Sequence, residues 1–311
     1  MRSRPLHDPH PLDYQATILL VVAAGALSAK RLMGFDLEAL VMDYRVWRAE
    51  PWRLFTSCLL HGSWFHLAFN LVWTLRFGAL LEPILGTAWM VALYLFLGVG
   101  PIAAQWTVAG PAIGLSGVGY GLFGLLLALD RWDPRYGGVM TRKTAELFGL
   151  WFVFCIVATI FDWMPVANTA HGAGVVLGLG IGWSIARQGR RRALGIVALV
   201  AASLLLALSA TVLRPLVNRS EARAWELAHE AYLALEREEN RLALDYLEAS
   251  LAILPTAPGQ WHNLGVALER LGRSEEAEAA LRRERELEAE EKRNPPARRS
   301  LRDVMPRALV E

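Results

Sequence analysis

The stretch of sequence that decides the fold lies between residues 108 and 129, and its centre reads Gly114-Leu115-Ser116-Gly117-Val118-Gly119-Tyr120-Gly121. The whole stretch is apolar or glycine-rich and carries no charged residue, which predicts a helix embedded in a membrane. Polar side chains are costly in hydrocarbon, and those found there usually serve a function. Ser116 is such a side chain, so it is the first candidate for a reactive group.

Further apolar runs on both sides of this stretch are also long enough, at roughly 20 residues, to cross a bilayer. We therefore expect an all-α fold, in which a polytopic membrane helix bundle is followed by a soluble helical region. The seven expected spans run from Tyr14 to Met33, Leu59 to Leu81, Ala88 to Trp106, Ile113 to Leu129, Thr144 to Phe161, Ala167 to Ala186 and Ala193 to Leu213.

The composition divides the chain into two unlike parts. Of its 311 residues 54% are hydrophobic, and the apolar runs end near Leu213, whereas Glu, Arg, Ala and Leu dominate from Ser220 onward. The formal net charge of only +2 gives no sign of a nucleic-acid partner. The two cysteines offer neither a disulfide framework nor a metal-ligand spacing. We therefore expect no metal, no cofactor and no nucleic-acid binding.

Basic residues in the short loops predict the orientation in the membrane. They gather in the N-terminal tail (residues 1–13), between residues 130 and 143, and between residues 187 and 192. Seven crossings place all three groups on one side, which the positive-inside rule makes the cytoplasm. The loop 34–58 falls outside although it carries three arginines, and we interpret it as a structured element lying on the membrane. The region after the seventh span is then also outside, on the side of Ser116.

Three polar residues of other spans are expected to join Ser116. His171 heads a glycine-rich span, while His66 and Asn70 are four residues apart and share one helix face. A serine hydroxyl becomes a good nucleophile when a base takes its proton, and an oxyanion needs positioned donors. His171 is the candidate base, and the Asn70 amide, the His66 ring N–H and the Ser116 backbone N–H are candidate donors. No carboxylate pairs with His171, which indicates a dyad whose imidazole packs against Tyr120.

Two rows of small residues predict how Ser116 and His171 meet. Gly117 and Gly121 are four residues apart, as are Gly174, Gly178 and Gly182. Such rows allow two membrane helices to approach closely. If the rows face each other, the first turns of both helices are neighbours.

These stretches together resemble the motifs of rhomboid intramembrane serine proteases. Residues 114–121 are similar to the nucleophile motif of that family. Residues 61–70 are similar to its His-x4-His-x3-Asn motif of the second span, and residues 168–174 are similar to its histidine motif of the sixth span. Glu50-Pro51-Trp52-Arg53 is similar to the Trp-Arg element of the first outer loop, and Glu82 with Gly86 to a Glu-x3-Gly turn. The resemblance covers roughly Tyr14 to Ala186.

The resemblance implies a six-span catalytic core over residues 14–190 and a serine endopeptidase that cleaves transmembrane proteins near the outer membrane face. It assigns Ser116 as the nucleophile and His171 as the general base. The oxyanion hole is then formed by His66, Asn70 and the Ser116 N–H. Active-site support is expected from Tyr120, Asn168, Gly114 and Gly117.

Residues 191–219 are expected to form the seventh span and a linker, residues 220–292 soluble helices, and residues 293–311 a disordered tail. A period of 34 residues relates Leu227 to Trp261, Ala231 to Gly265, Ala234 to Leu268, Ala243 to Ala277 and Leu247 to Leu281. This pattern resembles tetratricopeptide repeats, helical scaffolds that bind a protein or peptide partner. The alternative is a pair of plain helical hairpins without a ligand.

Each motif alone has a structural explanation, because small residues, histidine and asparagine also serve helix packing in membranes. Two other functions are therefore considered, namely a catalytically silent rhomboid-like adaptor and a scaffold that acts through its repeats. The presence of both Ser116 and His171 favours the protease. We expect a multi-pass protein of a bacterial inner membrane, in contact with the lipid bilayer and with transmembrane protein substrates.

Overall fold

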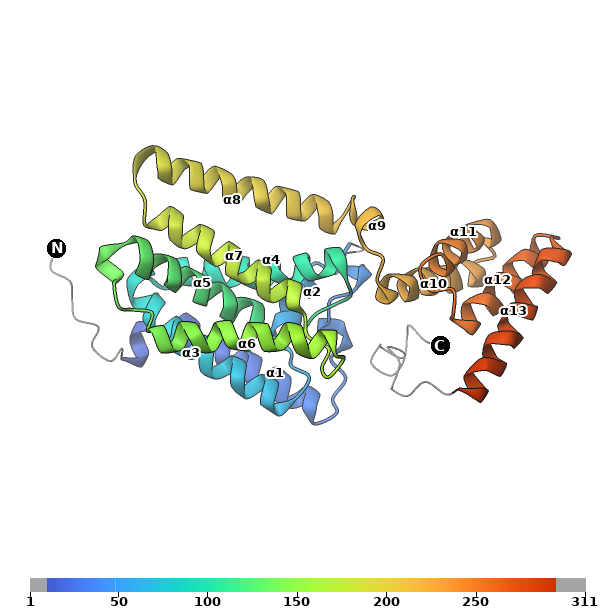
Figure 1. Ribbon diagram of the computed structural model, residues 1–311, viewed down its shortest axis with the longest axis horizontal. Helices are drawn as coiled ribbons and strands as arrows, with labels where there is room; N and C mark the ends of the chain where they lie inside the picture. The colour runs from blue at the N-terminus through green and yellow to red at the C-terminus, as the bar shows by residue number, and fades with distance from the viewer. Residues whose placement is uncertain (1–9, 48, 295–311) are drawn as a thin grey trace. The chain divides into compact units, whose positions relative to one another are not determined.

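The computed structural model describes residues 10–47 and 49–294. These residues form thirteen α-helices and five short 3-10 helices (Figure 1), so the fold is all-α as expected. The predicted N-terminal tail lies largely outside the described residues, and so does the predicted disordered tail. The described residues separate into two compact units. One comprises the residues up to Thr107 together with Pro111–Arg214, and the other comprises Val108–Gly110 and the residues from Pro215 onward.

The first unit is a bundle of long helices. Its helices are α1 (Gln15–Leu32), α2 (Arg53–Thr56), α3 (Trp64–Leu85), α4 (Thr87–Val108), α5 (Ser116–Trp132), α6 (Arg142–Ile160), α7 (Asn168–Ile185) and α8 (Gly189–Ala210). The short α9 (Arg214–Val217) contains the boundary between the units, which falls after Arg214. Among the described helices, five are long and apolar enough to cross a membrane, namely α1, α3, α4, α6 and α8. The chain is therefore a multi-pass membrane protein.

Two of the seven predicted spans, α5 and α7, are not among these five candidates. α5 has only 17 residues, and most of its side chains are buried by neighbouring helices. The glycines of α7, together with Asn168 and His171, lower its mean hydropathy. A helix enclosed by other helices does not need the apolar surface of one that faces lipid, so α5 and α7 can be short and glycine-rich. Whether they complete seven crossings stays a prediction.

Two helices begin later than the apolar pattern suggested. α3 begins at Trp64 instead of Leu59, because the Ser63 side chain caps it by accepting the N–H of His66 at 3.2 Å. α5 begins at Ser116 instead of Ile113, because Gly114 has a φ of +108° that interrupts a right-handed helix. Apolar residues continue through the loop before α5, so hydropathy alone could not locate the start of that helix.

A buried carboxylate joins α3 to the start of α1. Glu82 accepts the backbone N–H groups of Ala16 and Thr17, each at 2.9 Å, and the hydroxyl of Thr17 at 2.7 Å. The first N–H groups of a helix lack intrahelical partners and favour a negative charge. Glu82 therefore caps α1, and the Thr17 hydroxyl also contacts that of Tyr94 on α4 at 2.7 Å. Gly86 then ends α3 with a φ of +85°.

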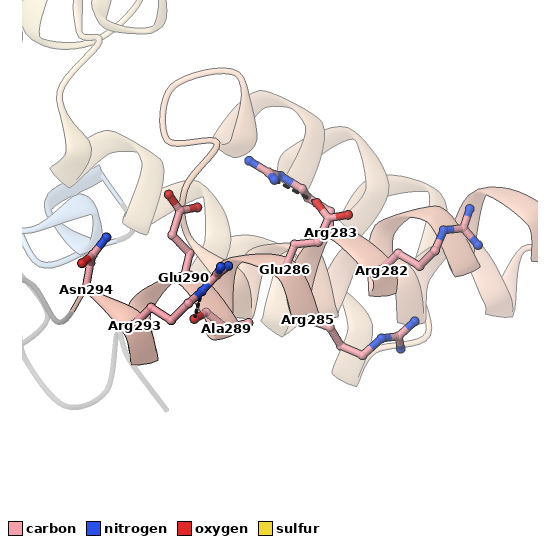
Figure 2. A pocket seen from close by; sticks show the side chains of 8 residues that line it. All are labelled: Arg282, Arg283, Arg285, Glu286, Ala289, Glu290, Arg293 and Asn294. Atoms are coloured by element: carbon pink, nitrogen blue, oxygen red, sulfur yellow. Dashed lines mark hydrogen bonds and ion pairs between the residues drawn. The ribbon is translucent and has the colours of Figure 1, made fainter.

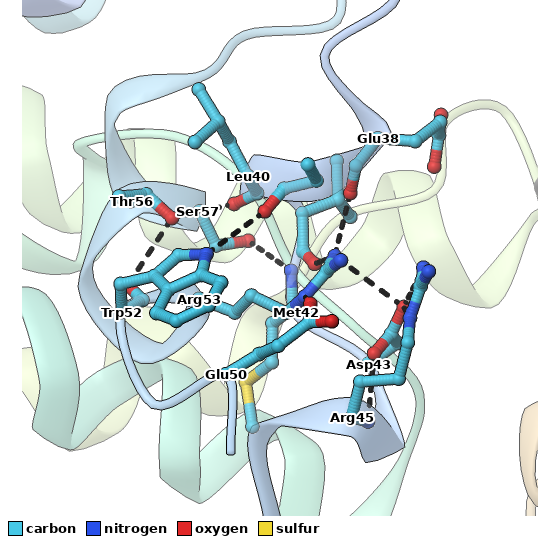
Figure 3. A network of polar contacts seen from close by, with 12 residues as sticks. Glu38, Leu40, Met42, Asp43, Arg45, Glu50, Trp52, Arg53, Thr56 and Ser57 are labelled. Carbon is cyan, nitrogen blue, oxygen red and sulfur yellow. Dashed lines mark hydrogen bonds and ion pairs between the residues drawn. The ribbon is translucent and has the colours of Figure 1, made fainter. Parts of the chain in front are cut away.

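The loop between α1 and α3 is structured, as expected, around the buried side chain of Arg53 (Figure 3). Its guanidinium donates to the carbonyl oxygens of Glu38 at 2.6 Å and Val41 at 2.7 Å. It also pairs with the carboxylates of Glu50 and Asp43. These bonds fold the loop back on itself and lead the chain into residues 57–61, which hold the segment before Ser116.

The second unit contains four amphipathic helices, α10 (Glu221–Glu236), α11 (Asn240–Leu251), α12 (Pro258–Arg270) and α13 (Ser274–Arg293). Successive helices pack against each other around a core of alanines and leucines. Gly265 of α12 permits a close approach to α13, since a Cβ there would lie 2.7 Å from the Leu281 side chain. Two successive helix pairs are expected both for tetratricopeptide-like repeats and for plain helical hairpins. The assignment of repeats therefore stays a prediction.

Candidate active site

Ser116 is the first residue of α5 and is half-buried. The loop before it turns at Gly114, whose positive φ favours glycine. A Cβ on Gly114 would also lie only 2.7 Å from Cε1 of His66. A glycine is therefore required here twice over, for the turn and for the approach of the His66 ring to the segment that carries Ser116.

Three hydrogen bonds hold the segment that leads to Ser116. The Ser57 hydroxyl donates to the Ala112 carbonyl at 2.6 Å, and the Gly114 N–H donates to the Ser57 carbonyl at 3.2 Å. The Leu115 N–H donates to Nε2 of His61 at 3.2 Å. The sequence analysis included His61 only as part of the motif at residues 61–70, and it missed Ser57, because a single serine carries no pattern that would single it out.

The glycine rows of α5 and α7 face each other as predicted. A Cβ on Gly174 would lie 2.4 Å from the carbonyl oxygen of Gly117, and one on Gly178 would lie 1.9 Å from that of Gly121. The two backbones therefore touch without side chains between them. Because Gly117 follows Ser116 and Gly174 lies one turn beyond His171, this contact brings the first turns of α5 and α7 together.

His171 is buried in the first turn of α7. Its ring lies on that of Tyr120, with centroids 4.6 Å apart and planes inclined by 33°. Its Nδ1 is buried, and no hydrogen bond reaches it from the described part of the chain. Packing on an aromatic ring therefore orients the imidazole, in line with the expectation from sequence.

His66 and Asn70 lie one turn apart on α3. The ring of His66 meets that of His61 edge-on, with centroids 4.8 Å apart. The amide of Asn70 is buried and donates to the backbone carbonyl of His66 at 3.0 Å. Since an amide nitrogen carries two hydrogens, this bond leaves Asn70 one further donor.

Asn168, which was predicted to support the active site, directs its side-chain amide to α6. It donates to the Thr159 hydroxyl at 2.7 Å and to the Cys155 carbonyl at 3.4 Å. It thereby ties the start of α7 to the end of α6, and its role in the site stays a prediction.

A cavity of about 10 Å³ lies beside Ser116, enough for roughly one water molecule. Small and apolar residues line it, among them Pro101, Gly117 and Ala170. The N-terminal end of α5 meets this space with backbone N–H groups that have no intrahelical partner, a partial positive charge suited to an anion. The site thus combines a hydroxyl, a nearby imidazole and donors for negative charge.

A wider open groove of about 750 Å³ lies on α13 (Figure 2), but its residues do not form a comparable set. Its side chains are mainly arginines and glutamates that pair along the helix, as Arg283 does with Glu286 at 3.0 Å. Arg293 donates to the Ala289 carbonyl at 3.2 Å. These charged side chains converge on no reactive group among the residues that line the groove, so we take the smaller space at Ser116 as the candidate site.

The chain is similar to known proteins over the part that contains Ser116. Residues 48–188 match the rhomboid domain. The chain is 31% identical over 191 residues to the rhomboid protease GlpG of Salmonella paratyphi A, an alignment that covers 58% of this chain and 66% of the relative. It is 33% identical over 161 residues to the rhomboid protease GlpG of Salmonella newport, covering 49% of this chain and 57% of the relative.

The alignments leave out part of each protein. The chain spans less than two thirds of the length of these curated relatives, and the family match includes none of the helices of the second unit. Within the match lie Ser116, His171, His66 and Asn70. Over residues 48–188 this multi-pass membrane protein is therefore similar to the rhomboid domain and to rhomboid proteases.

Proposed function

We propose that the chain is an intramembrane serine endopeptidase that cleaves transmembrane proteins near the outer face of a bacterial inner membrane. Ser116 acts as the nucleophile and His171 as the general base. The contact between the glycine rows of α5 and α7 carries this proposal, because it brings the hydroxyl and the imidazole to adjacent first turns. The activity named for the relatives agrees with it.

The reaction follows from the roles of these groups. The Ser116 oxygen attacks the carbonyl carbon of the scissile peptide while its proton passes to His171. The oxygen of the tetrahedral intermediate takes the negative charge and receives hydrogen bonds from His66, Asn70 and the Ser116 N–H. His171 then gives its proton to the leaving amine, which breaks the C–N bond. In the second half of the reaction, a water oxygen attacks the acyl carbon while its proton passes to His171, and His171 returns that proton to the Ser116 oxygen as the ester bond breaks. A cavity for one water lies beside Ser116.

The seven-crossing topology is part of the proposal, with α5 and α7 completing a six-span core and α8 as the seventh span. Arginines at positions 187 and 190–192 precede or begin α8 and favour a cytoplasmic start. Beyond its other end, Arg214 packs on Trp106 in the last turn of α4. α4 leads to the segment before Ser116, so the chain leaves the membrane unit on the side of the nucleophile.

The C-terminal helices are proposed to be a tetratricopeptide-like module outside the membrane that binds a protein or peptide partner. Their alternation of helix pairs and the 34-residue period support this assignment. The competing function, a silent adaptor that binds membrane helices, needs no reactive Ser116. The retained serine and histidine, and their adjacent first turns, favour the enzyme.

The test uses the full chain in lipid vesicles with a transmembrane reporter protein. Ser116→Ala and His171→Ala should each reduce cleavage to background, because members of a catalytic unit fail together. Ser184→Ala is the matched control, since this serine of α7 donates to the Gly180 carbonyl of its own helix. A fluorophosphonate should label wild-type protein at Ser116. Wild-type cleavage by a folded Ser116→Ala variant would overturn the assignment.

A further inference from the structure

The C-terminal end of α4 is capped by side chains that follow 108 and 109 residues later in the chain. The last carbonyl groups of a helix have no partner within it. Arg214 donates from Nε to the Trp106 carbonyl at 2.9 Å, with its guanidinium carbon 3.5 Å from the centre of the Trp106 ring. The Asn218 amide donates to the carbonyl of Ala109, the residue after α4, at 2.5 Å.

Asn218 connects this helix end to the start of α10. Its side chain is fully buried, and its oxygen accepts the N–H of Ser220 at 3.0 Å and the Ser220 hydroxyl at 2.7 Å. The neighbouring Gly110 lies against α10, since a Cβ there would be 2.7 Å from that of Ala222. These contacts explain why Val108–Gly110 belong to the second unit although they lie between α4 and α5.

The chain therefore leaves the first unit and returns to it immediately before the candidate nucleophile. Gly110 belongs to the second unit and Pro111 to the first. From Ala112 onward the segment is fixed by Ser57 and His61. The conformation that presents Ser116 is thus set from two ends, by these bonds on one side and by Asn218 on the other.

We propose that Asn218 is a positioning residue for Ser116. By holding the Ala109 carbonyl it fixes the entry to residues 111–116, so that the C-terminal helical unit sets the reactivity of the serine. This inference rests on the proposed role of Ser116 and extends it, because it gives the region outside the rhomboid match a part in the reaction. A partner that binds the helical unit would act on Ser116 through the same bond.

The test compares a substitution that removes the hydrogen bond from Asn218 to Ala109 with one that removes a hydrogen bond between Asn218 and Ser220. Asn218→Asp keeps the oxygen that accepts from Ser220 but replaces the donor to Ala109 by a repelling carboxylate oxygen. Ser220→Ala, the matched control, removes a bond to Asn218 and leaves the bond to Ala109. In lipid vesicles, Asn218→Asp should lower kcat and the rate of fluorophosphonate labelling by up to about tenfold, the worth of one hydrogen bond, with KM unchanged. Ser220→Ala should match wild type in both rates.

Hydrogen exchange measured by mass spectrometry supplies a readout that does not need activity. In Asn218→Asp the amides of residues 108–115 should exchange faster, while those of α5 and α7 keep their wild-type rates. Wild-type rates of labelling and exchange in this variant would overturn the inference, and so would faster exchange throughout the first unit, which indicates unfolding. A wild-type chain that neither cleaves nor labels would contradict the proposed function instead, and exchange at residues 108–115 would still decide whether Asn218 holds the segment.

Discussion

The backbone N–H of Leu115 donates to Nε2 of His61 at 3.2 Å, so a buried imidazole holds the residue directly before Ser116. Since Nε2 accepts, the proton of the neutral ring is on Nδ1, which lies 2.9 Å from the Ser28 hydroxyl oxygen. The Ser28 hydroxyl in turn donates to the Leu59 carbonyl at 2.9 Å. A chain of hydrogen bonds thus runs from α1 through the loop before α3 to the start of α5.

This chain predicts a graded response to substitution of His61. His61→Ala leaves the buried Leu115 N–H without a partner, which costs about 1–3 kcal/mol. His61→Gln can still accept from Leu115 through its amide oxygen, and should retain more activity. The measurements are the rate of fluorophosphonate labelling and thermal unfolding in detergent. Equal losses in the two variants would show that the bond to Leu115 does not matter.

Loss of an oxyanion donor on α3 should lower the rate of cleavage, but Ser116 should still react with a labelling probe. Removal of one oxyanion donor typically costs about 10²–10³ in rate. Asn70→Ala and His66→Ala should therefore slow cleavage of the reporter while Ser116 is still labelled at long times. Thr74→Ala, one turn beyond Asn70 on the same buried face of α3, serves as the control. If cleavage by Asn70→Ala equalled that by the control, Asn70 would have a packing role only.

The seam between α5 and α7 should not tolerate a methyl group. In Gly178→Ala the new Cβ would lie 1.9 Å from the Gly121 carbonyl oxygen, so the helices must separate and both activity and stability should fall. Gly119→Ala is the matched control within α5, because nothing lies within 4 Å of its Cβ. Alanine in a helix is favoured over glycine by roughly 0.5–1 kcal/mol, so this control should unfold no earlier than wild type. An unchanged melting temperature in Gly178→Ala would contradict this account of the seam.

The proposed topology can be tested with reporter fusions in a bacterial host. Alkaline phosphatase fused after Glu311 should be active in the periplasm, whereas green fluorescent protein fused there should remain dark. Fusions at Gly138, between α5 and α6, should give the reverse pair of results, because the basic residues of this loop favour the cytoplasm. Cytoplasmic fluorescence from the C-terminal fusion would mean that α8 does not cross.

The sequence predicted the all-α class and located the long helices, because their apolar runs correspond to surface that faces lipid. It also indicated what would follow if the glycine rows of α5 and α7 faced each other, since small residues at a spacing of four allow two membrane helices to approach closely. The start of α5 was wrong by three residues, because the run of apolar residues from Ala112 to Leu115 hides the positive φ of Gly114.

The contacts that fix the candidate site were harder to predict. Ser28 and Ser57 are single serines whose importance depends on carbonyl groups and rings brought close by the fold. Asn218 and Arg214 are distant in sequence from the helix end that they cap. No local period marks such pairs, because each consists of one polar side chain and one main-chain group. The roles of Ser116, His171, His66 and Asn70 remain predictions, which the variants above test.

The contact between Gly174 and Gly117, and between Gly178 and Gly121, has a consequence for how activity is lost on heating. Main-chain atoms set the spacing of α5 and α7, and these atoms cannot adjust by changing rotamers. Gradual loosening of side chains elsewhere should therefore leave the Ser116–His171 geometry intact. Heat should inactivate the protein abruptly, at the temperature where the two helices part, instead of eroding its rate by degrees.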